Sequence, residues 1–544
     1  MMNSLAVLAV QNWVSHWLTP LWLLSVGVLA GMILLVLIGA IAWLLSRLPG
    51  IGTLADQVGG REGSWLGQVV VRPLTILVSR RTLAEVPQAV REGALWPLFI
   101  MALSLSAFGI LGALFVQQPW DLLASLERLP HAGTRTESFQ VPVSEYDFPG
   151  EVFAELVPHQ KPISLVAEEV RSLTFESDQN LSIAMWPFDE VAPGQTLEVI
   201  AGEPATWFRS HHAEETLIPE GFDSFYIRNL GGETAEVSLT IVTAPPHPQV
   251  STIPITAVFV VIVFVLYLWQ RALAPRLSAI ALSTYKSEIA QPLFPLLLLL
   301  GLFLLWIFVW IPYNTFGEDI KMLKDSGLVV IMLLGILLAV WSASGSVADE
   351  IEGKTALTVL SKPVGRRSFI LGKFLGIVWT LAVLFAVLGL MLLIVVAYKP
   401  IHEARETATQ DLTWQLTHME MVYTVPSLAL AFMETVVLAA ISVAISTRLP
   451  LLANFTICLA IYLLGHLTPL IVQSAMGQFV FVQFFGQLIA TILPNLDHFR
   501  TEAAVAAGLP VPLVYVGTAL LYCVVYSLIA MLLALALFED RDLA

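Results

Sequence analysis

Acidic, hydroxyl-bearing and basic side chains are concentrated in one segment of the chain, DEIEGKTALTVLSKPVGRRSFILGKFLG, residues 349–376. Its first residues approach a phosphate-binding P-loop, the motif that a nucleotide-hydrolysing protein would need. However, Ala348 stands where the P-loop requires its first glycine, and the three carboxylates before Lys354 would repel phosphate. The residues before Ala348 also have the composition of a membrane helix and not of a strand. We therefore expect no ATP binding here, and no other loop of this kind occurs in the sequence.

Two further ionisable residues, Glu434 and His466, fall inside apolar runs. A charge near the centre of a membrane helix costs about 2.5 to 3.5 kcal/mol on insertion scales, so Glu434 should face protein or water. Two interpretations are open for Glu434. It belongs to a substrate path, an ion pair or a proton-responsive gate, or it is a protonated carboxyl bonded to a neighbouring Ser or backbone carbonyl. For His466, a bridge between helices is the simpler expectation than ligand binding.

Neither the histidines nor the cysteines predict a metal centre or another cofactor site. The adjacent pair His211 and His212 lies near two glutamates, but neighbouring residues on a strand point to opposite faces. Because no ligand spacing is repeated, a solvated loop is the preferred interpretation. Cys458 and Cys523 both lie in apolar runs, which gives no sign of a disulfide, a thiol-based zinc site or a redox pair.

Composition indicates that a lipid bilayer is the main solvent of this chain. Hydrophobic residues make up 57% of it and charged residues 13%, and the mean hydropathy is +0.79. These values are typical of a polytopic membrane protein. A spanning helix needs about 20 apolar residues, and nine segments are candidates: residues 19–46, 94–116, 253–269, 293–311, 328–348, 370–398, 426–447, 451–472 and 513–537.

Positive charges predict the orientation of these spans in a cell membrane, which we expect to be a bacterial inner membrane. Short loops rich in Lys and Arg stay on the cytoplasmic side. The loop after the fifth span carries five such residues: Lys354, Lys362, Arg366, Arg367 and Lys373. Nine spans then place the N-terminus outside and the C-terminus in the cytoplasm.

Residues 473–495 carry no charge and could form a tenth span, but glutamines at 473, 478, 483 and 487 recur near a helical period. A polar stripe prefers protein or water to lipid. We interpret the segment as a re-entrant or interfacial helix on the outer side. A true span would reverse the side of the C-terminus.

The segment 117–252 differs from the rest in charge. It has 21 Asp and Glu against 6 Lys and Arg, a net of −15, which equals the charge of the whole chain. Period-two alternation in residues 196–200, 225–228 and 235–242 predicts strands, and Gly231 and Gly232 between the last two are a hairpin signal. We expect an acidic, extracytoplasmic β-sandwich or jelly-roll domain.

Several residues of the charged loop match a known pattern. Ile351, Leu357 and Leu360 can line one side of a short helix, and Pro363 would end it. Together with the acidic residues before it and the basic residues after it, this loop resembles the docking loop of the type-2 ABC transporter permeases, the membrane subunits of ABC exporters. The matching residues are Glu350, Glu352, Thr355, Leu360, Ser361, Pro363, Arg366, Gly372 and Lys373.

This resemblance implies a function and partners. A separate ABC ATPase would dock on the cytoplasmic loop 349–369, and the permease would pair with a second copy or a related permease in the lipid membrane; no nucleic acid is expected. Two such cores form the transport pathway, and closure of the ATPases would push the docking loops. The chain would be a transporter subunit, not an enzyme, and Leu273–Gln291 is similar to the family's interfacial elbow helix.

The expected fold class is a mainly α, polytopic membrane protein with an inserted extracytoplasmic β-sandwich-like domain. We divide it into an N-terminal pair of spans with a basic loop (1–116), the acidic β-rich domain (117–252), the third span with the elbow (253–292) and a six-helix permease core (293–544). Two other functions stay open. One is a membrane-anchored assembly or sensor protein working through its β domain, and the other is a membrane enzyme acting on lipid or glycan, for which we find no nucleophile motif.

Overall fold

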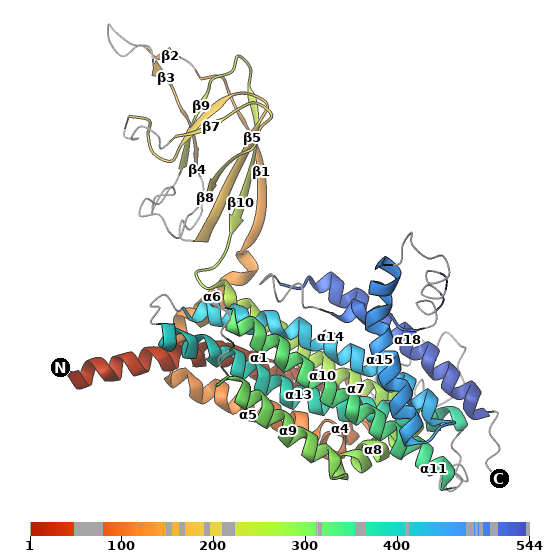
Figure 1. The fold of residues 1–544 in the computed structure, drawn as a ribbon. Coiled ribbons are helices and arrows are strands. Elements are labelled where there is room, and N and C mark those ends of the chain that lie inside the picture. The colour runs from red at the N-terminus through yellow and green to blue at the C-terminus, as the bar shows by residue number, and fades with distance from the viewer. Residues whose placement is uncertain are drawn as a thin grey trace. The chain divides into compact units, whose positions relative to one another are not determined.

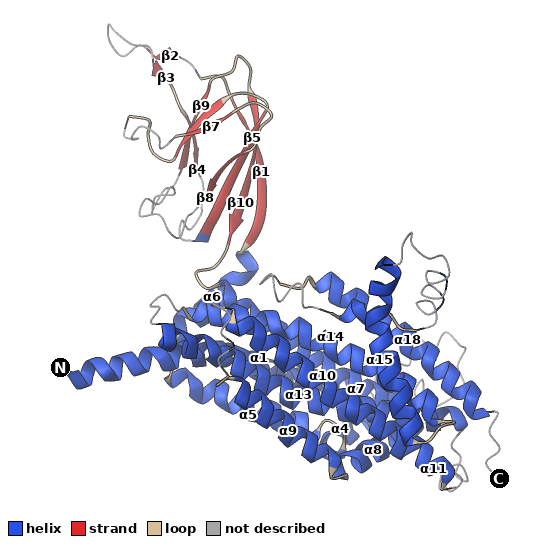
Figure 2. Cartoon of the chain, in the orientation of Figure 1, coloured by secondary structure: helices blue, strands red, loops and turns tan. Residues whose placement is uncertain are grey.

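The computed structural model describes most of the chain, and the structural statements below concern these residues only: 2–47, 80–116, 118–144, 146–147, 155–162, 169–189, 196–208, 224–311, 313, 318–353, 365–407, 413–474, 484, 488, 493–500 and 510–539. They form two compact units. The membrane unit comprises residues 1–117 and 252–544, and the β unit comprises residues 118–251. The described strands all lie in the β unit (Figure 2).

Long apolar helices build the membrane unit, because a helix satisfies its own backbone hydrogen bonds in lipid. In Figure 1 α1, α10, α13 and α14 lie side by side with roughly aligned axes. The main helices are α1 (Met2–Arg47), α4 (Arg80–Glu92), α5 (Trp96–Leu111), α7 (Thr252–Leu273), α8 (Pro275–Ala290), α9 (Leu293–Phe308), α10 (Asp319–Ala343), α13 (Arg366–Thr407), α14 (Trp414–Ser446), α15 (Leu451–Ser474) and α18 (Leu513–Glu539).

Within the described residues, seven helices are long and apolar enough to cross a membrane. The pair α8 and α9, bent by 63°, counts as an eighth candidate, and α15 adds a shorter apolar helix, Leu451–Leu467. Each of the nine predicted spans therefore coincides with a helix, although α14 begins earlier than predicted, at Trp414. Most of residues 473–495 lies outside the described residues, so the re-entrant helix stays a prediction.

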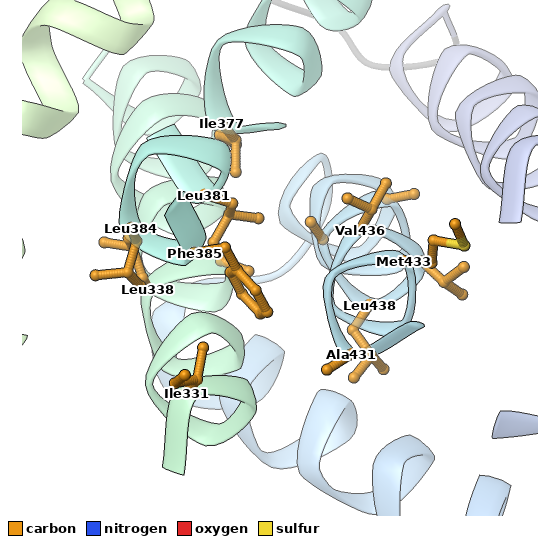
Figure 3. Packing of buried hydrophobic residues seen from close by; sticks show 14 of the residues in the cluster. Ile331, Leu338, Ile377, Leu381, Leu384, Phe385, Ala431, Met433, Val436 and Leu438 are labelled. Atoms are coloured by element: carbon orange, nitrogen blue, oxygen red, sulfur yellow. The ribbon is translucent and has the colours of Figure 1, made fainter. Parts of the chain in front are cut away.

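The core of the membrane unit lies where α10, α13 and α14 meet. Ile331, Leu381 and Leu438, one from each helix, are fully buried, and Figure 3 shows the side chains packed between these helices. Gly335 permits this approach, since an added Cβ would lie 2.6 Å from the Phe385 ring. Close packing therefore holds α10 and α13, the two helices on either side of the predicted docking loop.

The β unit is a sandwich of two four-stranded sheets, with orders β1-β10-β5-β8 and β4-β9-β6-β7, and a short β2-β3 ladder. Its core joins both sheets: the Phe175 and Phe225 rings, one from each, have centroids 5.3 Å apart. The strands are β1 (Gly133–Val141), β2 (Tyr146–Asp147), β3 (Glu155–Leu156), β4 (His159–Pro162), β5 (Val170–Ser177), β6 (Leu181–Ala184), β7 (Leu197–Val199), β8 (Ala205–Phe208), β9 (Ser224–Asn229) and β10 (Ala235–Thr243). A short helix, α6 (Pro119–Arg128), precedes them. The predicted fold class, a mainly α membrane protein with an inserted β-sandwich domain, is confirmed.

The three predicted strands correspond to β7, β9 and β10, but the predicted hairpin at Gly231 and Gly232 is wrong. β9 and β10 belong to different sheets, so the connection crosses the sandwich. The Asn229 side-chain amide holds this crossing by donating to the carbonyl oxygens of Val141 at 3.2 Å and Glu233 at 2.9 Å. Both strands bury their alternating apolar residues in the same interior, a pattern that a hairpin and a sheet-to-sheet crossing share.

Candidate functional site

The predicted docking loop leaves the membrane unit from an irregular helix end. After α10, residues Ser344–Ala348 form a π-helical turn, η7, followed by the single turn α11 (Asp349–Glu352). The chain is described again from Gly365, just before α13. Glu350, Glu352, Arg366 and Lys373 are therefore placed. The other predicted loop residues lie outside the described residues: Thr355, Leu357, Leu360, Ser361 and Pro363.

An ion pair joins the two ends of this loop. The Lys373 ammonium on α13 donates to Glu350 Oε1 on α11 at 2.5 Å. The lysine side chain is only 9% exposed, against 31% for the glutamate, and its Nζ lies 5.5 Å from the centre of the Phe369 ring. Because a buried charge is stable only when it is paired, Lys373 fixes the second turn of α13 to α11, the last turn before the loop.

The elbow helix α8 adds a second carboxylate that the sequence analysis had not assigned to the site. Glu288 is 1% exposed and interacts electrostatically with both Lys373 and Glu350. Close packing brings α8 here, since a Cβ added at Gly376 would meet the Ala281 carbonyl oxygen at 2.6 Å. In the sequence, the one indication that Glu288 belongs to the site was its position as the single acidic residue of α8, near the end of that helix.

The basic pair at the start of α13 contacts the end of α18. Arg366 donates to the Glu539 carbonyl oxygen at 3.0 Å, which satisfies one of the open carbonyls at that helix end. Arg367 lies 3.9 Å from the Glu539 carboxylate, and the Phe369 and Phe538 rings stack with centroids 5.8 Å apart. We call this end of the membrane unit, with α11, the first turns of α13 and the last turn of α18, the loop end.

The two intramembrane ionisable residues, considered separately in the sequence, face each other. Glu434 Oε1 on α14 lies 3.5 Å from His466 Nε2 on α15. His466 Nδ1 is 3.1 Å from the Tyr462 carbonyl oxygen, which can only accept, so Nδ1 carries a proton. Glu434 is 2% exposed, and Arg500 also acts on it electrostatically. At this distance the carboxylate and the imidazole are near neighbours, but Glu434 Oε1 makes no hydrogen bond among the described residues.

A further set of buried ion pairs lies at the opposite end of the same helices. Lys324 of α10 pairs with Glu420 of α14. Lys399 of α13 lies 3.5 Å from Asp319 Oδ2 and donates to the Val309 carbonyl oxygen, just past the end of α9, at 3.3 Å. These contacts tie α9, α10, α13 and α14 together far from the loop end.

No group of three His, Cys, Asp or Glu side chains that could hold a metal ion occurs in the described part of the chain. The pair His211 and His212 lies outside it. At the loop end, charged side chains of the described residues join helices: Lys373 pairs with Glu350, and Arg366 bonds to the end of α18.

Comparison with known proteins assigns the membrane core. A family model described as ABC-2 family transporter protein matches residues 277–543, a range that contains α9, α10, α13, α14, α15 and α18 and most of the elbow helix. No curated protein matches the chain. Residues 277–543 of this multi-pass membrane protein are therefore an ABC-2 family transporter domain, which supports a permease membrane subunit.

Proposed function

We propose that the chain is the permease of an ABC exporter, energised by a separate ATPase subunit that docks on the loop 349–369. A second permease, identical or related, would complete the transport pathway. The β unit would receive, gate or hand off cargo on the outer side. The family assignment supports a permease subunit, and the ATPase, the partner permease and the direction of transport are our inferences.

One observation carries the proposal: both ends of the loop are fixed to the transporter core. The Glu350–Lys373 pair closes the loop at its base, and Arg366 links the same region to the end of α18. A force applied to the tip of a loop held in this way moves α10, α13 and α18 together instead of bending the loop. This is the mechanical property that an ATPase needs in a partner.

Orientation follows from charge. The Lys and Arg residues of the loop favour the cytoplasmic side, and this orientation would put residues 117–252 outside and the C-terminus inside. Both native cysteines are buried, so single cysteines introduced near Thr358 and in the β unit at Glu203 can be labelled with little background. Labelling of position 358 from outside intact cells would overturn the proposed orientation.

Affinity purification of the full-length chain from its native membrane tests the partner. We expect an ABC ATPase to co-purify, and expect Leu360→Asp combined with Pro363→Ala to abolish its capture. Leu449→Asp, in the turn between α14 and α15 on the same side of the membrane, is the matched control and should leave capture unchanged. Equal capture by all three proteins would contradict docking on this loop.

The alternative function, an assembly or sensor protein working through the β unit, is favoured by one observation. This unit has its own buried core, which includes Phe175, Ile227 and Leu239. If the β unit tethered by one unrelated membrane helix restored the phenotype of a deletion strain, transport would be unnecessary. We expect no restoration.

A further inference from the structure

Asn454, in the first turns of α15, is the centre of a buried polar cluster that the sequence analysis did not single out. Its side-chain Nδ2 lies 2.9 Å from Ser344 Oγ, 2.8 Å from Ser442 Oγ and 2.8 Å from Ser446 Oγ. Asn454 and the three serines are at most 1% exposed. A single amide therefore joins η7, α14 and α15 in a place that water does not reach.

Ser344 connects this cluster to the docking loop. Its carbonyl oxygen accepts from the Asp349 backbone N–H, five residues later, which is the hydrogen bond of a π-helical turn. π-helical turns are rare in helices and are found frequently at functional sites. The bonded Asp349 begins α11, and the next residue, Glu350, pairs with Lys373. Contacts thus run without interruption from Asn454 through η7 to the base of the loop.

The donors and acceptors of the cluster do not match in number. A carboxamide has two N–H protons, but three hydroxyl oxygens lie within bonding distance of Nδ2. The Asn454 Oδ1 is occupied by the Cys458 thiol at 3.3 Å. If η7 moves and Ser344 withdraws, Ser442 and Ser446 on α14 can still accept both protons. The Ser344 contact can therefore break without leaving an Asn454 amide proton unpaired, whose cost would oppose such a change.

We infer that Asn454 is a positioning residue for transport: it holds η7 in its π-helical register and releases it when the docking loop is displaced. If the π-helical turn changes to α-helical hydrogen bonding, one residue fewer fits into that turn. The helix that follows then rotates by about 100°, because an α-helix has 3.6 residues per turn. A loop displacement would then become a rotation of α11 relative to α14 and α15. The release step rests on the proposed function, whereas the hold on η7 does not.

Two serine variants separate the hold from general loss of packing. Ser344→Ala removes the η7 partner of Asn454, whereas Ser446→Ala removes an α14 partner and leaves Ser344 in place; both delete one buried hydroxyl. Hydrogen–deuterium exchange on the purified full-length permease measures the backbone amides of residues 344–353. We expect about fivefold faster exchange in Ser344→Ala, the size of effect expected for one lost hydrogen bond, and no change there in Ser446→Ala. Equal exchange in the two variants would overturn the inference.

The coupling role has its own readout. With the co-purified ATPase, we expect Ser344→Ala and Asn454→Leu to keep the ATPase bound but to lose the effect of the permease on its ATP hydrolysis rate, while Ser446→Ala behaves as wild type. Normal coupling in Ser344→Ala would refute the release step. Failure of the wild-type permease to bind any ATPase would instead refute the proposed function, and the exchange experiment would still decide whether Asn454 holds η7.

Discussion

The two units of this protein place their charges and their apolar side chains in opposite ways. In the β unit, large apolar residues such as Phe175, Phe225 and Leu239 form the buried core, and none of its described Lys, Arg, Asp or Glu residues is buried. In the membrane unit Leu452 and Leu521 are 79% and 65% exposed, while charged side chains are buried. All the buried Lys and Glu residues of the described chain are in the membrane unit: Glu288, Lys324, Lys373, Lys399 and Glu434.

Solvent explains the difference. Water drives apolar groups into the β unit, whereas lipid is as apolar as leucine and gives no such drive between helices. In lipid the costly groups are charges, so these gather inside the helix bundle and pair there. Stability of the β unit should therefore depend on its apolar core, and stability of the membrane unit should depend in large part on its polar contacts.

The largest expected effect is in the β unit. Phe175→Ala removes a buried ring that packs edge-on against both Trp207 and Phe225, which should cost about 3 to 5 kcal/mol. In contrast, Leu521→Ala on the exposed surface of α18 should have little effect on stability. Thermal unfolding of the full-length protein in lipid nanodiscs, with limited proteolysis to report on each unit, measures both. A similar loss in the two variants would contradict the comparison.

The next largest effect is in the membrane unit. Lys399→Met removes a buried cation from its pair with the half-buried Asp319 and should cost about 3 kcal/mol, as the loss of one member of a buried ion pair does. Lys321→Met is the matched control two residues from Asp319. Its exposed pair with Glu318 should contribute less than about 1 kcal/mol. The melting temperatures of Lys399→Met and Lys321→Met in nanodiscs test the prediction, and equal values would contradict it.

A smaller effect distinguishes charge from hydrogen bonding at Glu434. Glu434→Gln keeps a polar side chain beside His466 and should change stability by less than about 1 kcal/mol, whereas Glu434→Leu removes the polar group that lies 3.5 Å from His466 Nε2 and should cost about 1 to 3 kcal/mol. The same thermal assay measures both variants. If Gln and Leu are equally destabilising, the negative charge itself is what the helices require.

The smallest effect concerns pH and belongs to the β unit. Burial lowers the pKa of His247 below its usual value of 6.5, and the Asp121 carboxylate opposes part of this. A histidine that is harder to protonate when folded favours unfolding as the pH falls below 6.5, and its contribution is fully present at higher pH. The urea midpoint of the β unit, followed by proteolysis of the full chain, should fall less between pH 7.5 and 5.5 in His247→Asn than in the wild type. An unchanged pH dependence would contradict this.

The membrane helices and the position of the charged loop could be predicted from local sequence, because hydrophobic runs, charge bias and loop motifs are properties of neighbouring residues; the docking role of the loop stays a prediction. The pairing of Glu350 with Lys373 could not be predicted in this way. The two residues are 23 positions apart in the sequence, and only the antiparallel return of α13 brings them together. The Asn454 cluster is a stronger case. Its serines are on two other helices, and a lone asparagine in an apolar run gives no indication of which side chains it meets.

The β unit shows the same limit. The alternation of apolar and polar residues identified β7, β9 and β10 but not the sheet that each strand joins. Strands of both sheets bury every second side chain in the same interior, so their sequence patterns are alike.

The sequence by itself determined that this is a multi-pass membrane protein with one acidic, strand-rich insertion and a permease-like loop, since solvent preference and helix length are decided residue by residue. Only the tertiary structure decided which buried charges pair, that Glu434 and His466 face each other, and that a π-helical turn connects Asn454 to the loop. These depend on helix rotation and on contacts distant in sequence, which close packing fixes and composition does not.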